Sequence, residues 1–215
     1  MGNLFNMDNK VFSVLSKMAD LFILNILFLA TCIPIFTIGA AIASMYQVTL
    51  KMVKDEESYI IKGYLAAFKS NFKKSTIIWL GAMFVGIILG VDLFITNANA
   101  GIMWRVLHIL ALSLSISLII ISTYVFPLQA KFENSCKNTL KNAWIMSVKH
   151  FPTTIVVVGL NSLVIVCILF NNLTLVYGLA GYTLIGFALT AYLNSYFFNK
   201  VFEKYYDQPE VEDTY

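Results

Sequence analysis

The sequence predicts an all-α membrane protein: a polytopic bundle of about five transmembrane helices, joined by short connections and amphipathic helices. Hydrophobic residues make up 59% of the 215 residues and charged residues only 13%, which is too apolar for a soluble domain of this size. Several charge-free stretches reach the length of about 20 residues that a helix needs to cross a bilayer. We therefore expect a single integral membrane domain over residues 1–215, in a multi-pass arrangement in the cell membrane.

The charge-free stretches locate the spans. They cover residues 21–50, 75–91, 106–130 and 152–199, and the polar pair Asn171-Asn172 interrupts the last one. We expect the membrane spans near residues 18–36, 75–96, 102–126, 152–170 and 174–197.

The first span is expected to be irregular. A straight helix over 21–50 would be roughly 45 Å long, against a hydrocarbon core of about 30 Å. Pro34 disfavours helix at Ile33, and Gly39 permits a turn. The Pro34 region is therefore either a bent span or a re-entrant segment. With five crossings and a bent span the amino terminus lies outside, whereas a re-entrant segment places it inside.

Amphipathic helices are expected at the cytoplasmic surface, near residues 39–74 and 128–150. In both segments apolar side chains recur at three- and four-residue steps, while lysines occupy the other positions. This pattern is typical of a helix that lies along a membrane surface or against a partner.

The basic residues predict the orientation. Segments 51–74, 127–151 and 197–215 hold twelve of the fifteen Lys and Arg residues, so they should face the cytoplasm. The connections at 97–101 and 171–173 hold none and should be the short outer turns. The uneven charge thus indicates membrane orientation, and we expect no nucleic-acid partner.

The order of elements also indicates a parallel repeat of helical hairpins. An amphipathic basic helix, a span, an outer turn and a second span occur twice. The second span runs into Lys131-Phe132-Glu133 in one half and into Val201-Phe202-Glu203 in the other. The two hairpins should therefore share one orientation in the membrane.

Polar residues at membrane depth are the candidate site residues, because such groups are costly in a bilayer. Asp92 and Arg105 are expected to form a structural ion pair near the outer turn, and the alternative is a substrate or proton site. His108 is expected to hydrogen-bond within the bundle. The amides are expected to bond between helices, or otherwise to line a polar path. The intramembrane polar set is Asn25, Gln47, Asp92, Arg105, His108, Asn161 and Asn194.

A second candidate surface is formed by aromatic side chains of the amphipathic helices. These stripes either anchor the helices in the membrane or dock a partner protein. Glu133 falls within one apolar arc, where it either meets a basic group of a partner or reaches water. The candidate docking residues are Phe68, Phe72, Phe132, Glu133 and Trp144.

Signatures of catalysis and of cofactor or metal binding are absent from the sequence. It contains no phosphate-binding glycine loop, no HExxH and no GxSxG motif. The cysteines Cys32, Cys136 and Cys167 are widely spaced, which argues against a disulfide framework or a zinc site. We therefore expect a protein that is not an enzyme, with no catalytic residues, no cofactor and no metal.

One part of the chain resembles a known family. The residues that carry the resemblance are Leu24-Asn25, CIPIFTIGAA, Met45-Tyr46, Leu50-Lys51, Asp55-Glu56-Glu57 and Ala67-Phe68-Lys69-Ser70-Asn71-Phe72-Lys73-Lys74. They resemble the YesL-like family of bacterial integral membrane proteins, a domain of unknown function, most closely over residues 18–80. The family-motif positions are Pro34, Thr37, Gly39, Phe68, Asn71 and Phe72.

This resemblance implies an inner-membrane protein of Gram-positive type bacteria, often encoded beside carbohydrate ABC importers and glycoside hydrolases. The leading hypothesis is an accessory subunit, assembly factor or regulator of a carbohydrate ABC importer. Its partners would be the lipid bilayer and the importer's permease subunits, with a homo-oligomer as a further option. The alternative is a small independent membrane carrier. A membrane enzyme of envelope glycan metabolism ranks last, because it lacks candidate catalytic groups.

Overall fold

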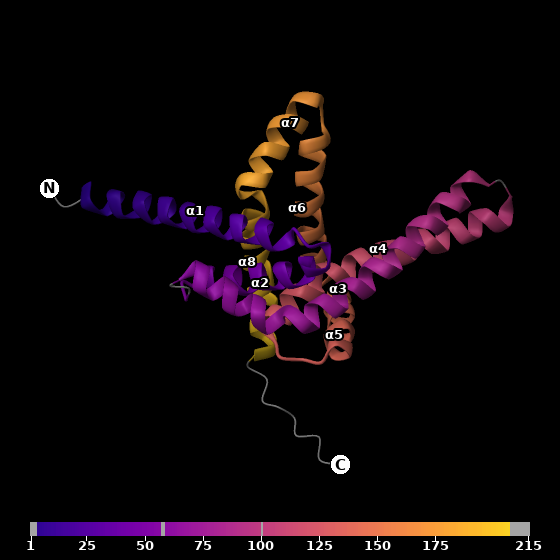
Figure 1. Ribbon diagram of the computed structural model, residues 1–215, viewed down its shortest axis with the longest axis horizontal. Helices are drawn as coiled ribbons and strands as arrows, with labels where there is room; N and C mark the ends of the chain where they lie inside the picture. Colours follow the sequence, from indigo (N-terminus) through magenta and orange to yellow (C-terminus); the bar gives the residue numbers. More distant parts are fainter. Residues whose placement is uncertain (1–3, 57–58, 100, 207–215) are drawn as a thin grey trace, which may run out of the picture.

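In a computed structural model, which describes residues 4–56, 59–99 and 101–206, the chain is helical and this part of it contains no strand (Figure 1). The elements are α1 (Leu4–Cys32), the 3-10 turn η1 (Ile35–Thr37), α2 (Ile38–Met52), α3 (Ile60–Ala98), α4 (Ile102–Lys131), α5 (Cys136–Lys149), α6 (Phe151–Leu169), α7 (Asn172–Gly181), the π-helical turn η2 (Tyr182–Gly186) and α8 (Phe187–Tyr206). The predicted all-α class is confirmed.

Helix α2 forms the centre of the molecule. It packs against α1, α3, α4 and α8, and eleven of its fifteen residues are buried. Three alanines of this helix, Ala40, Ala41 and Ala43, are fully enclosed, which lets the neighbouring helices approach closely. We expected residues 39–74 to lie at the cytoplasmic surface. Their first part, α2, is instead surrounded by the other helices of the protein.

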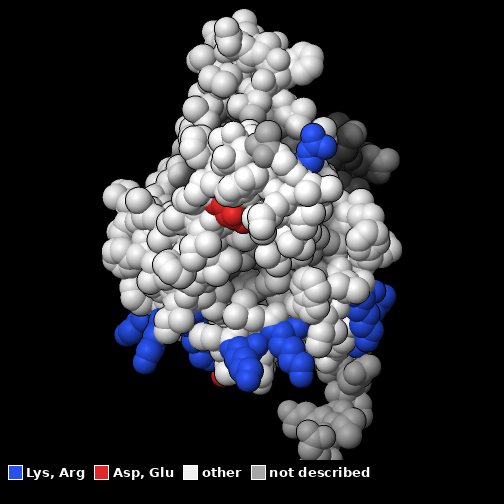
Figure 2. Space-filling model, turned by 90° about the vertical axis from the view of Figure 1, so that its right-hand side faces the viewer, with Lys and Arg blue, Asp and Glu red and all other residues white. Residues whose placement is uncertain are grey.

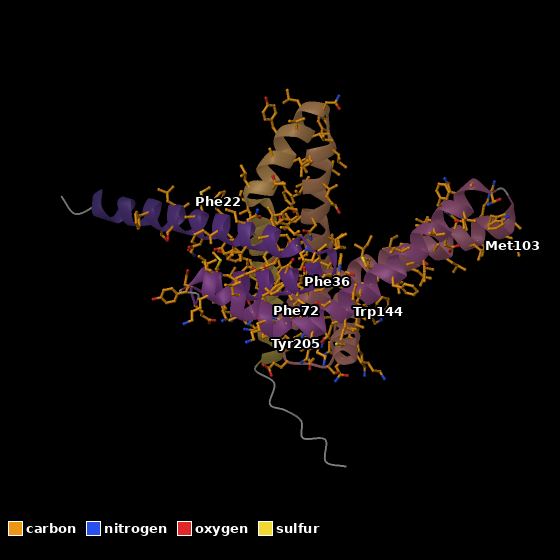
Figure 3. The ribbon with its side chains drawn as sticks, viewed as in Figure 1. Phe22, Phe36, Phe72, Met103, Trp144 and Tyr205 are labelled. Carbon is orange, nitrogen blue, oxygen red and sulfur yellow. The ribbon has the colours of Figure 1, made fainter. Side chains whose placement is uncertain are left out.

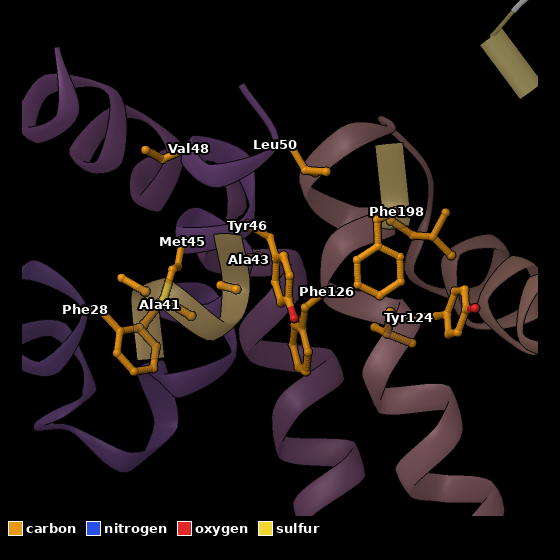
Figure 4. Packing of buried hydrophobic residues seen from close by; sticks show 14 of the residues in the cluster. Phe28, Ala41, Ala43, Met45, Tyr46, Val48, Leu50, Tyr124, Phe126 and Phe198 are labelled. Carbon is orange, nitrogen blue, oxygen red and sulfur yellow. The ribbon is translucent and has the colours of Figure 1, made fainter. Parts of the chain in front are cut away.

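An aromatic cluster joins α2 to α4 and α8 at the base of the molecule (Figure 4). The ring of Phe198 meets the rings of Tyr46 and Tyr124 edge to face, with centroids 5.8 and 5.2 Å away. Such edge-to-face pairs stabilise a core beyond the area they bury. The last helix of the chain is thus fixed against two earlier ones.

Two long hairpins project from this base and diverge (Figure 1). One is formed by α3 and α4, and the other by α6 and α7. Their outer parts are apolar and uncovered; Phe94 and Phe170, near the two ends, are 78% and 79% exposed. Figure 3 shows side chains standing out along both hairpins, with Met103 at the far end of the first one. A soluble protein does not expose apolar surface on this scale, whereas a membrane covers it with lipid.

Six helical stretches are long and apolar enough to cross a membrane, judged by length and composition. Five of them correspond to the predicted spans, although the first one ends at Cys32 and not near residue 36 as expected. The sixth is Ile35–Met52, which corresponds to η1 and α2. The amphipathic segment predicted near 39–74 is divided between α2 and the first part of α3, and that part of α3 is continuous with the following span. We expected one helix to end and the next to begin near Lys74, because the charge-free stretch starts at residue 75. A change from polar to apolar residues does not itself end a helix, and α3 continues through it.

The segment 128–150 also differs from its expected form, because it is not a single amphipathic helix. Helix α4 continues through Pro127 to Lys131, and an irregular stretch follows. Helix α5 then begins after Ser135, whose side chain accepts a hydrogen bond from the Asn138 backbone N–H at 3.3 Å. A serine cap of this kind starts a new helix.

Lys and Arg side chains gather along the lower edge of the molecule, and the upper hairpin end carries uncharged side chains in this view (Figure 2). This distribution matches the charge asymmetry of the sequence. Phe132 and Phe202, the equivalent residues that close the two hairpins, meet edge to face with ring centroids 5.5 Å apart.

Candidate functional site

A groove between the two hairpins is the candidate site. It has a volume of about 420 Å³ and its walls come from α2, α3, α4 and α6. Most of its lining is apolar, with Trp79 and Phe126 among the larger side chains. Polar groups enter from Tyr46, Asn161 and the adjacent pair Ser122 and Thr123, the last two on α4. An apolar groove with a few convergent polar groups is the usual form of a binding site.

Three side chains from three helices form a polar cluster beneath this groove. The Nδ2 group of Asn194, on α8, donates to Tyr46 Oη and to Asn161 Oδ1, both at 3.3 Å. Asn194 is only 1% exposed, and its Oδ1 atom has no hydrogen-bond partner. The structure thus brings together two of the predicted polar residues, Asn161 and Asn194, and adds Tyr46 to them.

Asn25 does not contribute to this groove. Its Nδ2 group donates to the Thr183 carbonyl at 2.7 Å, and its Oδ1 accepts from the Ala188 backbone N–H at 3.0 Å. Residues 183 and 188 are five apart, which is the spacing that a π-helical hydrogen bond joins. One buried amide of α1 therefore satisfies both backbone groups at the π-helical turn, and Asn25 acts as a structural bond between α1 and η2.

Gln47 and Asn71 join α2 to α3. The Asn71 Nδ2 group donates to Gln47 Oε1 at 2.7 Å and to the Ala67 carbonyl at 3.0 Å. Asn71 was predicted as a family-motif residue and Gln47 as an intramembrane polar residue. The structure shows that the two are hydrogen-bonded to each other. Phe68 and Phe72, the other motif residues of α3, meet edge to face with ring centroids 5.6 Å apart.

The remaining motif residues shape the turn between α1 and α2. Thr37 Oγ1 donates to the carbonyls of Thr31 and Pro34, at 2.5 and 2.6 Å. Helix α1 ends at Cys32, so the Thr31 carbonyl lies in its last turn, where carbonyls lack the N–H partners of a continuing helix. The Thr37 side chain supplies a hydrogen bond to it. Trp79 of α3 donates its indole N–H to the Ile35 carbonyl at 2.9 Å and fixes the same turn from outside.

Gly39 gives the closest approach of α2 to α3. A Cβ atom at this position would lie 2.5 Å from both the Ser75 carbonyl oxygen and Trp79 Cβ. No side chain fits there without moving a helix. The motif positions thus describe how α1, the turn, α2 and α3 pack together.

The expected ion pair between Asp92 and Arg105 is not formed. Among the described residues, the ion pairs are Lys17–Asp55 at 2.8 Å and Lys54–Glu203 at 3.0 Å. Arg105 is exposed and Asp92 is half-buried.

The bond that closes this hairpin is instead between Thr96 Oγ1 and His108 Nδ1, at 2.9 Å. His108 therefore bonds within the bundle, as its predicted role required. Thr96 could not be selected from the sequence, because a threonine near the end of an apolar helix is common and has no distinctive spacing.

The docking residues have different environments. Phe72 and Trp144 are 38% and 47% exposed, and Glu133 is also exposed. Phe68 and Phe132 are half-buried and pack against the core. Only the first three thus present a free surface to a partner.

Sequence reasoning missed the contacts that tie α8 to the end of α2. Thr49 Oγ1 and Ser195 Oγ are 2.8 Å apart, and Asn199 Nδ2 donates to the Leu50 carbonyl at 3.0 Å. The signal was present in the spacing, because Asn194, Ser195 and Asn199 follow one another in a span that otherwise carries apolar and aromatic residues. Polar residues grouped this way in an apolar helix indicate a face that meets protein.

The described residues contain no cluster that could bind a metal ion and no disulfide. Within the described residues, no three side chains of the His, Cys, Asp and Glu types lie together in a way that could hold a metal ion. The three cysteines are free, and Cys167 is exposed on the α6–α7 hairpin. The polar groups described above bond helices to one another, and some of them line the groove.

The fold and the site together define a class: a polytopic helical protein, apolar on its outside and held together inside by amide and hydroxyl bonds between helices. Residues 21–93, which include the last part of α1, the turn, α2 and most of α3, match the model of a family described as "Protein of unknown function, DUF624". This match confirms the resemblance to the YesL-like family in the first part of the chain. No curated protein and no solved structure matches the sequence.

Proposed function

We propose that this chain is an accessory subunit, assembly factor or regulator of a carbohydrate ABC importer in the bacterial cytoplasmic membrane. The supporting observation is the divergence of the two hairpins. They leave apolar surfaces and the groove between them open to the membrane, where a helix of a partner can pack (Figure 1). The importer as partner follows from the genetic neighbourhood that the family resemblance implies.

The polar residues at membrane depth support this class over an independent carrier. Asn25, Gln47 and Asn194 each hydrogen-bond to another helix of the same chain. Such bonds hold a fixed bundle together, whereas a carrier needs polar groups directed at its substrate. A rigid base with exposed arms is suited to binding a partner protein.

The groove itself is the observation that favours the carrier as a second candidate. Tyr46, Ser122, Thr123 and Asn161 give it several hydroxyl and amide groups, which are the groups that bind sugar hydroxyls. On this alternative the protein moves a small polar solute by itself.

Co-purification distinguishes the two. We expect the full-length protein, extracted in mild detergent from its native membrane, to bring down the membrane subunits of an importer. Replacing the exposed aromatic residues with Phe72→Ala and Trp144→Ala should remove this association at normal protein abundance, because neither side chain belongs to the buried core.

The matched control is Phe12→Ala, an exposed aromatic residue of α1 that lies on neither hairpin, which should leave the association intact. The accessory proposal is wrong if the unaltered protein brings down no importer subunit and transports a sugar alone in proteoliposomes. A loss of abundance in the double variant would assign the two aromatic residues to membrane anchoring.

A further inference from the structure

A second cleft, separate from the groove, lies between α1 and the first turns of α3. It has a volume of about 710 Å³. Its walls are mainly apolar, and three of its large side chains are open to the surroundings: Ile23, Ile61 and Leu65 are 37%, 53% and 52% exposed. The cleft also carries three charged groups, which are Asp20 on α1 and Lys62 and Lys69 on α3.

The position of the cleft is fixed by an ion pair. Lys17, one turn before Asp20, bonds to Asp55 at 2.8 Å in the connection between α2 and α3. Lys54, next to Asp55, bonds to Glu203 near the end of α8. The cleft therefore lies at the level where the basic segments gather, which is the level of lipid headgroups on the cytoplasmic side.

The two lysines lie on the same face of α3. They are seven residues apart, which is nearly two full turns, so they are separated by roughly 10 Å along the helix axis. Between them on this helix lie apolar residues of the cleft, among them Leu65 and Ala66. On this face of α3, an apolar surface therefore lies between the two lysine side chains.

Asp20 provides the opposite charge from the facing helix. Among the described side chains, none of these three groups has an ion-pair partner within 4.0 Å. A ligand that satisfies all of them needs an anionic group for the lysines, a hydrogen-bond-donating cation for the carboxylate, and an acyl chain for Ile23, Ile61 and Leu65.

We propose that this cleft binds a phospholipid whose headgroup carries both a phosphate and a primary ammonium, the chemistry of phosphatidylethanolamine. The phosphate accepts hydrogen bonds from Lys62 and Lys69, and the ammonium donates to Asp20. A choline headgroup has no N–H to donate, and an anionic glycerol headgroup leaves Asp20 facing a phosphate without a cation. The proposal is independent of any importer partner.

The test measures lipid binding to the full-length protein by native mass spectrometry in detergent. Phosphatidylethanolamine, phosphatidylcholine and phosphatidylglycerol with identical acyl chains are added in equal amounts. We expect the ethanolamine lipid to bind about tenfold more tightly than the other two, since one charge-assisted hydrogen bond accounts for a factor of this size.

Two variants separate the headgroup contacts. Asp20→Asn should abolish the preference for the ethanolamine lipid while retaining phospholipid binding. Lys62→Gln with Lys69→Gln should weaken binding of all three lipids. The matched control is Lys137→Gln with Lys141→Gln, two exposed lysines of α5 outside the cleft, which should change neither affinity nor preference.

Equal binding of the three lipids, a preference that survives Asp20→Asn, or an equal loss in the α5 control would each overturn the proposal. A photoactivatable phosphatidylethanolamine tests the unaltered protein as well, so the result does not depend on the variants folding. Its cross-links should fall within residues 18–24 and 59–69, and cross-links only elsewhere would also refute the site.

Discussion

Gly39 shows how one missing side chain sets the packing of two helices. Because a Cβ atom there would lie 2.5 Å from Ser75 and Trp79 atoms of α3, Gly39→Ala should lower the free energy of unfolding by about 1–3 kcal/mol. Thermal unfolding of the purified protein in detergent measures this change. Gly81→Ala is the matched control on α3, because nothing lies within 4 Å of the added methyl group. Equal stability of the two variants would contradict the close approach.

Asn25 offers a second test at this scale, because it is the side chain that bonds both backbone groups of the π-helical turn. Asn25→Ala leaves the Thr183 carbonyl and the Ala188 N–H without that partner, and should cost about 2 kcal/mol or more. Hydrogen exchange at residues 183–188 should also become faster. Asn99→Ala, which removes one exposed bond to the Ile95 carbonyl, should leave both measurements nearly unchanged. Unaltered exchange in the Asn25 variant would show that the π-helical turn holds without it.

Individual polar residues could be selected from the sequence, but their partners could not. An amide in an apolar run is costly enough to predict an interhelical bond, and Asn25, Asn161 and Asn194 all make one. Asp92 and Arg105 were matched by charge and depth alone. Near the outer turn both groups can reach water, so no desolvation penalty forces them to pair.

At the scale of elements, the two ion pairs indicate on which side the amino terminus lies. They place Lys17 of α1 at the level of the carboxyl end of α8, which the basic residues assign to the cytoplasm. Helix α1 runs continuously through Lys17 from Leu4. We therefore predict that α1 and α2, which meet at the Pro34 turn, enter and leave the membrane on the same side, and that the amino terminus is cytoplasmic.

Thiol labelling and a reporter fusion test this topology. In a chain whose three cysteines are replaced by serine, an impermeant thiol reagent on intact cells should modify Asn99→Cys and spare Lys137→Cys. Permeabilised cells should label both, which controls for access. A fluorescent protein fused to the amino terminus should mature in the cytoplasm. An alkaline phosphatase fused there should stay inactive, and activity would reverse the assignment.

The burial of α2 could not be predicted from its sequence pattern. Its polar residues lie at three- and four-residue steps, as on a helix that faces water. In the structure these groups meet protein: Ser44 bonds back to the Ala40 carbonyl, Thr49 meets Ser195, and Gln47 accepts from Asn71. Periodicity reports that one face of a helix is polar, and does not distinguish water from the polar groups of other helices.

At the scale of the whole molecule, the two hairpins are in contact where they end, at Phe132 and Phe202, and are far apart at their outer turns. Cysteine pairs should therefore cross-link at the first place and not at the second. In the serine background, Phe132→Cys with Phe202→Cys should cross-link readily with a short bifunctional thiol reagent, because the rings they replace are 5.5 Å apart. Asn99→Cys with Asn171→Cys, at the outer ends of the two hairpins, should not (Figure 1). Gel mobility under denaturing conditions reads out both pairs.

Cross-linking of the outer pair within a single chain would mean that the hairpins close against each other. The repeat of hairpins was visible in the sequence through its closing Phe-Glu pairs. The angle between the hairpins was not, because it depends on how α2 and α8 fill the space at the base.

The burial of α2 also has a consequence for the order in which the protein is made. Of the six candidate spans, the one containing α2 is the least apolar, and several of its bonding partners, Asn194, Ser195 and Asn199, belong to the last helix. During synthesis α2 leaves the ribosome more than a hundred residues before them. Until α8 is made, the groups of α2 that bond to it lack these partners. We therefore expect the packing of α8 against α2 to be a late step in the folding of this protein.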